Sequence, residues 1–196
     1  MEGAIKVLIL ALLYVAAFFL VELLGFYHPF AWTYSAVFIA VIAAWPYFKL
    51  CQRFPMPGVA IICAVLLLMC NFLLGEGHEY FAIGCVGFGC LAEVLRKFLG
   101  NYRDEKGVIA SYAVMSLIPF SMTCVLWVDY DTAMELLISR MGDIWAAVMG
   151  RMLSKYMLMS MIVLTLVLAV LTMWILTRNW RPSDKYDGYP REYPGE

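Results

Sequence analysis

The stretch "YMLMSMIVLTLVLAVLTMWILT", residues 156–177, decides the fold class because it contains no charged side chain. It is longer than the roughly 18 apolar residues that mark a membrane-spanning helix. In lipid, every backbone N–H and C=O group must find a partner within the protein, and an α-helix pairs all of them internally. This stretch therefore predicts a transmembrane helix.

Further uncharged runs precede this stretch, at Val7–Val21, Leu23–Phe48, Phe54–Leu74 and Val108–Val128. All but the first exceed the same roughly 18 residues. The first run is bordered by Lys6 and Glu22, whose long side chains can reach the lipid headgroups. The chain thus contains five apolar runs that we expect to cross a membrane.

A sixth candidate, Tyr80–Leu95, carries one charged residue. This residue, Glu93, lies three and four positions before Arg96 and Lys97, the spacing of an ion pair on a helix. A local ion pair and a proton-coupling carboxylate are the two interpretations. We predict six transmembrane helices, at about 5–24, 29–48, 57–74, 80–97, 108–128 and 156–177.

Composition supports one membrane domain. The chain is 64% hydrophobic and 15% charged, whereas soluble domains carry about 25% charged residues. We expect an all-α, polytopic integral membrane protein, with residues 1–181 as a single six-helix domain and residues 182–196 as a cytoplasmic tail. A net charge of −1 argues against nucleic-acid binding.

The distribution of basic residues predicts the orientation, because cytoplasmic connections are enriched in Lys and Arg. The N-terminus, the second and fourth connections and the tail hold most of them: Lys6, Lys49, Arg53, Arg96, Lys97, Arg103, Lys106, Arg178, Arg181, Lys185 and Arg191. The first connection, "GFYH", and the third, "GEGHE", hold none. We therefore expect both termini in the cytoplasm and the two histidine-bearing turns outside.

The connection between spans five and six, residues 129–156, predicts an amphipathic helix on the outer side. Thr132 and Glu135 have the spacing of a capping box. Apolar residues then recur on one face: Met134, Leu137, Ile138, Met141, Ile144, Trp145, Val148 and Met152. Such a helix either lies passively at the membrane interface or covers a cavity.

The turn within "LLGEGHEYFAIG", residues 73–84, places Glu76, His78 and Glu79 between two apolar runs. It can be a plain solvated turn, with Glu79 at the positive end of the next helix dipole. It can also be a gate for a substrate. A third possibility is a metal site that joins His28 to His78 and a carboxylate, although no H-E-x-x-H motif is present.

Other polar and aromatic residues leave two interpretations open. Pro119 must interrupt span five, and the nearby hydroxyls of Ser116, Ser121 and Thr123 either satisfy their own backbone or line a polar pocket. Trp32, Tyr34 and Trp127 either belong to the headgroup-level aromatic belt or stack on a flat ligand. Small residues on one face of span four favour close helix packing, either inside the bundle or against another membrane subunit: Ala82, Cys85, Gly89 and Ala92.

Motifs for catalysis are missing from the sequence. The chain has no G-x-S-x-G, no Gly-rich phosphate loop and no histidine deep within a span. We expect a protein that is not an enzyme, needs no cofactor and does not hydrolyse ATP itself.

The segments "GHEYFAIGCVGFGCLAEVLRK", residues 77–97, and "SYAVMSLIP", residues 111–119, resemble the Trep_Strep (MptD-like) family of small bacterial membrane proteins. Its members are regarded as substrate-binding S components of energy-coupling factor (ECF) transporters. The resemblance implies capture of a vitamin or similar micronutrient at the bacterial plasma membrane. A transmembrane T component and two ATPases would use ATP to drive its release inside the cell.

The resemblance also implies where the substrate binds. The lids would be Gly25–His28 and Gly75–Tyr80, and the pocket would lie among the outer halves of spans four to six. Together with the residue-based candidates, the expected substrate-binding residues are Tyr27, His28, Trp32, Glu76, His78, Glu79, Tyr80, Ser116 and Trp127. The alternatives are a non-transporting membrane assembly subunit and, less favoured, a divalent-metal uptake subunit.

Overall fold

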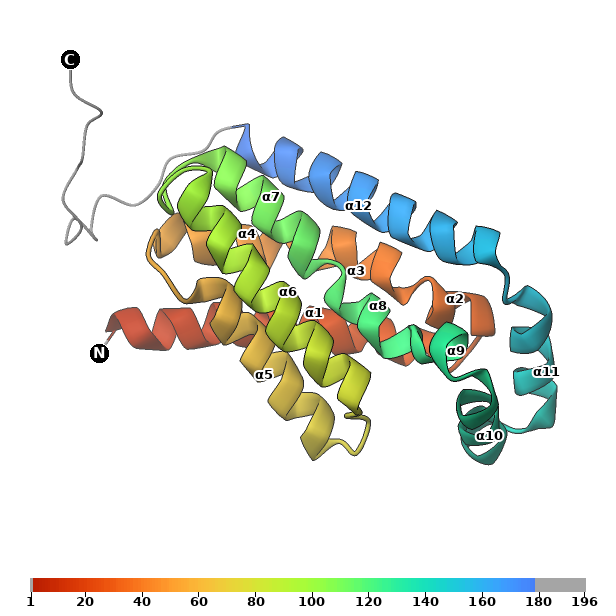
Figure 1. Ribbon diagram of the computed structural model, residues 1–196. Helices are drawn as coiled ribbons and strands as arrows, with labels where there is room; N and C mark the ends of the chain where they lie inside the picture. The colour runs from red at the N-terminus through yellow and green to blue at the C-terminus, as the bar shows by residue number, and fades with distance from the viewer. Residues whose placement is uncertain (1, 179–196) are drawn as a thin grey trace, which may run out of the picture.

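The computed structural model describes residues 2–178, which are helical throughout, apart from short connections, and contain no strand (Figure 1). The helices are α1 (Glu2–Gly25), α2 (Pro29–Thr33), α3 (Ser35–Ile42), α4 (Ala44–Arg53), α5 (Val59–Leu73), α6 (Glu79–Phe98), α7 (Glu105–Met115), α8 (Ile118–Thr123), α9 (Val125–Val128), α10 (Tyr130–Met141), α11 (Asp143–Met152) and α12 (Lys155–Thr177). The all-α prediction is confirmed for these residues. The predicted tail, residues 182–196, and the end of the predicted domain lie outside the described part of the chain.

Each predicted span is helical, but the second and fifth are interrupted. The second consists of α2, α3 and α4, with a bend of 41° between the last two. The fifth consists of α7, α8 and α9, and Pro119 sits in the first turn of α8, where its missing N–H costs no helical hydrogen bond. Ser116 and Ser121 donate hydrogen bonds to the carbonyls of Ala113 and Ile118, at 2.7 and 2.5 Å. The hydroxyls near the break thus satisfy their own backbone.

Two of the described helices are by themselves long and apolar enough to cross a bilayer. They are α1, over Ile5–Gly25, and α12. The bent pair α3 and α4 meets the same criteria when taken together, and α5 is apolar but shorter. Length and apolarity alone therefore identify fewer spans than the six predicted from sequence.

The helices pack side by side as a closed ring. Successive neighbours are in contact in the order α1, α5, α6, α7, α12, α3 and back to α1. The interior holds aromatic side chains from several helices: Tyr14, Phe18, Tyr47, Phe81 and Tyr112. Large apolar side chains of α1 and α12 remain exposed on the outside of the ring, as expected for surfaces that contact lipid.

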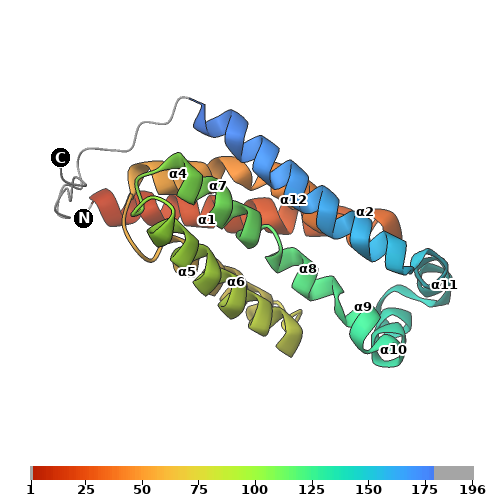
Figure 2. The same ribbon diagram turned by 45° about the horizontal axis from the view of Figure 1, so that its top comes forward.

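The connections gather at two opposite ends of the ring (Figures 1 and 2). The start of α1, the α4–α5 connection and the α6–α7 connection lie at one end, which we call the basic end. The α5–α6 connection, α9, α10 and α11 lie at the other, which we call the cavity end. The predicted grouping of "GEGHE" away from the two basic connections is thus present in the fold.

Small residues of α6 allow close packing against α5 and α8. A Cβ added at Gly89 would lie 2.8 Å from the Cβ of Ala64, and one added at Gly84 would clash with Ser121. Cys85 and Ala92 on the same side of α6 are buried. This face of α6 therefore packs inside the protein, which is the first of the two interpretations offered for small faces on membrane helices.

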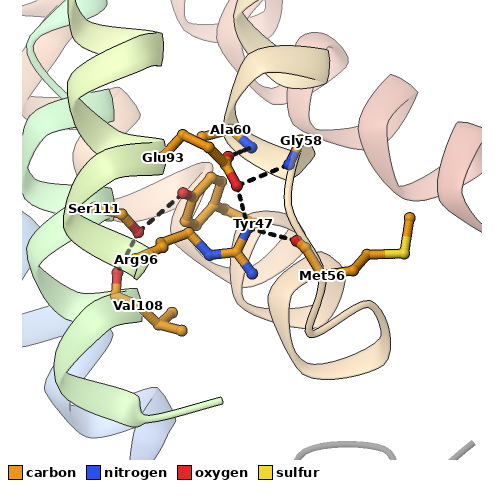
Figure 3. Close-up of polar contacts among 8 residues, drawn as sticks. All are labelled: Tyr47, Met56, Gly58, Ala60, Glu93, Arg96, Val108 and Ser111. Atoms are coloured by element: carbon orange, nitrogen blue, oxygen red, sulfur yellow. Dashed lines mark hydrogen bonds and ion pairs between the residues drawn. The ribbon is translucent and has the colours of Figure 1, made fainter. Parts of the chain in front are cut away.

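Glu93 fastens α6 to the start of α5 at the basic end (Figure 3). Its carboxylate accepts hydrogen bonds from the N–H groups of Gly58, at 2.7 Å, and Ala60, at 3.0 Å. The positive end of the α5 dipole faces this carboxylate, which adds a favourable electrostatic interaction. Glu93 therefore caps a helix to which it does not belong.

Arg96 completes this cluster. Its Nη1 lies 3.7 Å from Glu93 Oε1 and 3.5 Å from the carbonyl of Met56, and its side chain is fully buried. The predicted local ion pair thus forms with Arg96, whereas Lys97 is exposed. Nearby, the Tyr47 hydroxyl donates to Ser111 at 3.0 Å and ties α4 to α7 (Figure 3).

We expect Glu93→Ala to lower the free energy of unfolding by about 3–5 kcal/mol, because it leaves Arg96 buried without a counter-charge and two N–H groups without acceptors. Denaturant unfolding in detergent, followed by circular dichroism, measures the change. Glu135→Ala, on the exposed side of α10, is the matched control and should change stability by less than about 0.5 kcal/mol. Equal effects of the two substitutions would contradict the role assigned to Glu93.

Candidate functional site

A cavity of about 1110 Å³ opens at the cavity end of the ring. Its volume is slightly above the roughly 300–1,000 Å³ that small-molecule sites occupy. Four parts of the chain enclose it: the end of α1 with Trp32 of α2, the α5–α6 turn, α8 with α9, and α10. Helix α12 contributes no lining residue, so the cavity includes the first predicted span in place of the sixth.

Helix α10 forms one wall of this cavity. The predicted amphipathic helix is in fact two helices, because Gly142 adopts a positive φ of 87° and separates α10 from α11. Helix α10 also begins before the predicted capping box, since Asp129 accepts the N–H of Thr132. Its apolar side lines the cavity through Ala133, Leu136 and Leu137. The geometry therefore favours a helix that covers a cavity over one that lies passively at the membrane interface.

The α5–α6 turn is wound back onto the end of α5. The carbonyl oxygen of Asn71 accepts hydrogen bonds from the N–H groups of both Glu76, at 3.0 Å, and Gly77, at 3.1 Å. Gly75 supplies the positive φ of 76° that this turn requires. Gly77 instead allows close approach, because a Cβ there would lie 2.6 Å from the Phe72 ring.

An ion pair links this turn to α10. Arg140 pairs with the Glu76 carboxylate and also lies 3.5 Å from the carbonyl of Gly75. The two charged side chains are 42% and 41% exposed, so their pairing stabilises the closed arrangement by less than about 1 kcal/mol. We call this pair the latch, since it links two walls of the cavity and is weak enough to open.

His78 joins the start of α6 to α8. Its Nδ1 accepts the N–H of Phe81 at 3.3 Å and caps α6, while Nε2 lies 3.2 Å from the carbonyl of Met122. A carbonyl only accepts, so Nε2 carries the proton and the imidazole is neutral. Partial burial lowers the pKa of His78, although the Met122 carbonyl and the nearby Glu79 and Glu76 oppose this effect.

Among the lining residues that were not predicted from sequence, two carry enclosed polar atoms. Asn71 is fully buried and Glu22 is partly buried, and both face the cavity. Asn71 Oδ1 and Glu22 Oε1 are enclosed and accept no hydrogen bond from the described residues. A signal was available in the sequence, because Asn71 is the one side-chain amide in the run Phe54–Leu74.

The structure brings five of the predicted substrate-binding residues to the cavity: Trp32, Glu76, His78, Glu79 and Tyr80. The other four do not line it. Tyr27 is 87% exposed, and His28 caps α2 by accepting the N–H of Phe30 at 3.1 Å. The Ser116 hydroxyl donates a hydrogen bond to the carbonyl of Ala113 in the same segment. Trp127 packs into the apolar cluster between α9, α10 and α11.

Metal coordination has no support in the geometry of residues 2–178. No three His, Cys, Asp or Glu side chains among them converge as ligands. The two histidines suggested for a metal site cap different helices, and His28 does not line the cavity. The arrangement favours an amphipathic organic molecule, because the walls are mostly apolar with a few polar groups.

Because the folded-state pKa of His78 is lowered, the unfolded chain binds a proton more readily than the folded protein. The contribution of His78 to stability is therefore present above about pH 6.5 and is lost as the pH falls below that value. Protonation also removes the Nδ1 acceptor that caps α6. We expect the wild-type protein to lose more thermal stability between about pH 8 and pH 5.5 than His78→Asn, which keeps a capping side chain without a titratable group. Parallel melting curves for the two proteins would contradict this assignment.

Comparison with known proteins places the chain in a family. The model of a family described as hypothetical bacterial integral membrane proteins (Trep_Strep) matches residues 2–179. No curated protein and no solved structure matches the chain. The match covers nearly the whole chain and includes every residue that lines the cavity. The chain therefore belongs to the Trep_Strep family of bacterial integral membrane proteins.

Proposed function

We propose that this protein is the substrate-binding S component of an ECF-type ATP-driven importer in the bacterial plasma membrane. It captures a small organic molecule in the cavity on the outside and releases it inside with the help of a T component and two ATPases. The observation that carries the proposal is the cavity of about 1110 Å³ beneath α10, closed by a latch that contributes little stability. A protein with a purely structural role needs neither a lined cavity nor a movable cover.

The proposal includes a topology of six crossing helices with both termini inside. Helices α6 and α7–α9 are less apolar than α1 and α12. The free energy of placing the charged residues of α6 in the membrane is nevertheless lower than their number indicates. Glu93 and Arg96 neutralise each other and lie near its basic end. The turn that bears Glu76 and the loop that bears Arg103 lie at opposite ends of the ring, so they fall on opposite sides of the membrane in this topology.

Cysteine labelling tests the topology. Single cysteines replace Glu76 or Arg103 in a variant whose six natural cysteines are changed to alanine or serine. A membrane-impermeant maleimide added to intact cells should label position 76 and leave position 103 unlabelled. Permeabilised cells serve as the control, since both positions should then react. Labelling at 103 in intact cells would contradict the topology.

Capture begins when the latch opens. When Glu76 and Arg140 separate, α10 and the α5–α6 turn can move apart and admit a molecule from outside. Closure then re-forms the ion pair and places the molecule between α1, α8 and α10. The sequence holds no phosphate-binding loop, so the energy for release comes from the ATPases of the partner complex.

Affinity purification from the native host tests the function. The tagged protein, solubilised in mild detergent, should retain a second membrane subunit and two ATPases, identified by mass spectrometry. An unrelated membrane protein with the same tag is the control for carry-over. Recovery with only other non-transport membrane proteins would support the alternative of an assembly subunit and would contradict the proposed role.

A further inference from the structure

Two hydrogen-bond acceptors without partners face the same cavity. Asn71 Oδ1 and Glu22 Oε1 are both enclosed, and neither accepts a hydrogen bond of normal geometry from the described residues, although the Ser35 hydroxyl lies close to the Glu22 carboxyl group. Asn71 comes from α5 and Glu22 from α1, and these helices are in direct contact. An enclosed polar atom without a partner costs free energy, so native proteins keep such atoms where a ligand or water satisfies them.

The orientation of the Asn71 amide is determined by its other end. Its Nδ2 donates to the carbonyl of Leu67 at 3.1 Å. A reversed amide would set its oxygen against that carbonyl, so Oδ1 is the end without a partner. Both free groups are therefore acceptors, and a molecule that satisfies them must supply N–H or O–H donors.

The charges around the cavity favour a cation. Its acidic lining residues are Glu22, Glu76, Glu79 and Asp129, and its one basic lining residue is Arg140. Arg140 is already paired with Glu76 in the latch. His78 is neutral because Nδ1 accepts and Nε2 donates a hydrogen bond. The enclosed carboxylate of Glu22 thus has no positive side chain beside it in the lining.

The remaining lining residues indicate the shape and polarity of the uncharged part of the ligand. The lining residues from α1, the turn after it and α2 are apolar apart from Glu22, and α8–α10 add further apolar side chains to the lining. The first group is Phe19, Leu23, Phe26 and Trp32. Trp32 is held in place by edge-to-face packing on Trp145 of α11, with ring centres 5.8 Å apart. A flat or aromatic molecule fits such a surface better than a sugar or an inorganic ion.

We propose that the cavity binds an amphipathic organic cation, such as a protonated amine on an aromatic body, with Glu22 binding the cationic group and Asn71 Oδ1 accepting a second N–H. This inference rests on the proposed capture function and names the chemical class of its substrate. Glu22 and Asn71 act as the specificity-determining residues, and the latch closes over the bound molecule.

Three probes with one indole body and different side-chain charges test the inference. Tryptamine is a cation, tryptophol is neutral and indole-3-propionate is an anion. Each is titrated into the full-length protein in lipid nanodiscs, with empty nanodiscs as the control for partition into lipid. Binding is measured by thermal shift and by microscale thermophoresis of the fluorescently labelled protein, so that the indole probes do not contribute to the signal. Tryptamine should stabilise the protein most, with an affinity at least about tenfold higher than that of the anion.

Variants test the role of Glu22. Glu22→Gln should weaken tryptamine binding by about tenfold or more while the melting temperature of the ligand-free protein stays equal or rises, because an enclosed charge is removed. Glu135→Gln makes the same chemical change on the exposed side of α10, away from the cavity, and should leave binding unchanged. A structural role for Glu22 would instead lower the melting temperature and leave the order of the three probes as it was.

The outcomes separate this inference from the proposed function. If tryptophol or indole-3-propionate binds as well as tryptamine, the preference for a cation is wrong while capture of a small molecule stands. If none of the probes binds, the inference is overturned, and the affinity purification decides independently whether the protein serves an importer. A cation preference that survives in Glu22→Gln would overturn the assignment to that residue.

Discussion

Polar groups inside this protein must find their partners within the protein, because the surrounding lipid offers none. At the basic end that requirement is met by one carboxylate. Glu93 satisfies two N–H groups of α5 and pairs with Arg96, which itself reaches the carbonyl of Met56. The start of α5, the end of α6 and the connection before α5 are joined there. From this corner, the close contact of Gly89 with Ala64 continues the packing of α6 on α5.

Within the described part of the chain, the cavity end has interrupted helices and polar atoms without partners. The helices at this end are short or interrupted: the fifth span breaks at Pro119, and Gly142 separates α10 from α11. The enclosed acceptors of Glu22 and Asn71 are left without partners. A corner joined by Glu93 and Arg96 at one end and a cavity with free acceptors at the other are the two features on which the proposed capture function rests.

In the proposed function, Asn71 is the residue that connects binding to closure. Its backbone carbonyl holds the N–H groups of Glu76 and Gly77, whereas its side chain faces the cavity. A ligand that binds Oδ1 therefore contacts the residue on which the turn is wound, and the next charged residue of that turn forms the latch with Arg140. His78 adds a second link, because it caps α6 and reaches α8 through the Met122 carbonyl. The turn, the cover and the free acceptors are thus one connected unit.

Sequence alone determined the features that depend on local periodicity and on the cost of polar groups in lipid. Uncharged runs predicted the helices, and Pro119 predicted the break in the fifth span. The polar turn predicted four of the residues that line the cavity, and the outer aromatic residues predicted a fifth, Trp32. Local patterns also explain two differences. The prediction of one helix over residues 129–156 followed a continuous apolar stripe but gave no weight to Gly142. Tyr27 and His28 were chosen from the turn Gly25–His28, in which Phe26 is the residue that lines the cavity.

Tertiary structure decided which helix ends meet. Glu22 lies near the end of an apolar run, and in the sequence it is no different from a carboxylate that reaches the headgroups. Only the packing of the folded helices encloses it at the cavity that Asn71 also lines, near Ser35 of α3. Glu93 likewise has nearby basic residues on its own helix, but its capping of α5 depends on a residue 35 positions away. Hydrogen-bond partners and enclosure are set by neighbours across the ring, and periodicity along one helix carries no information about them.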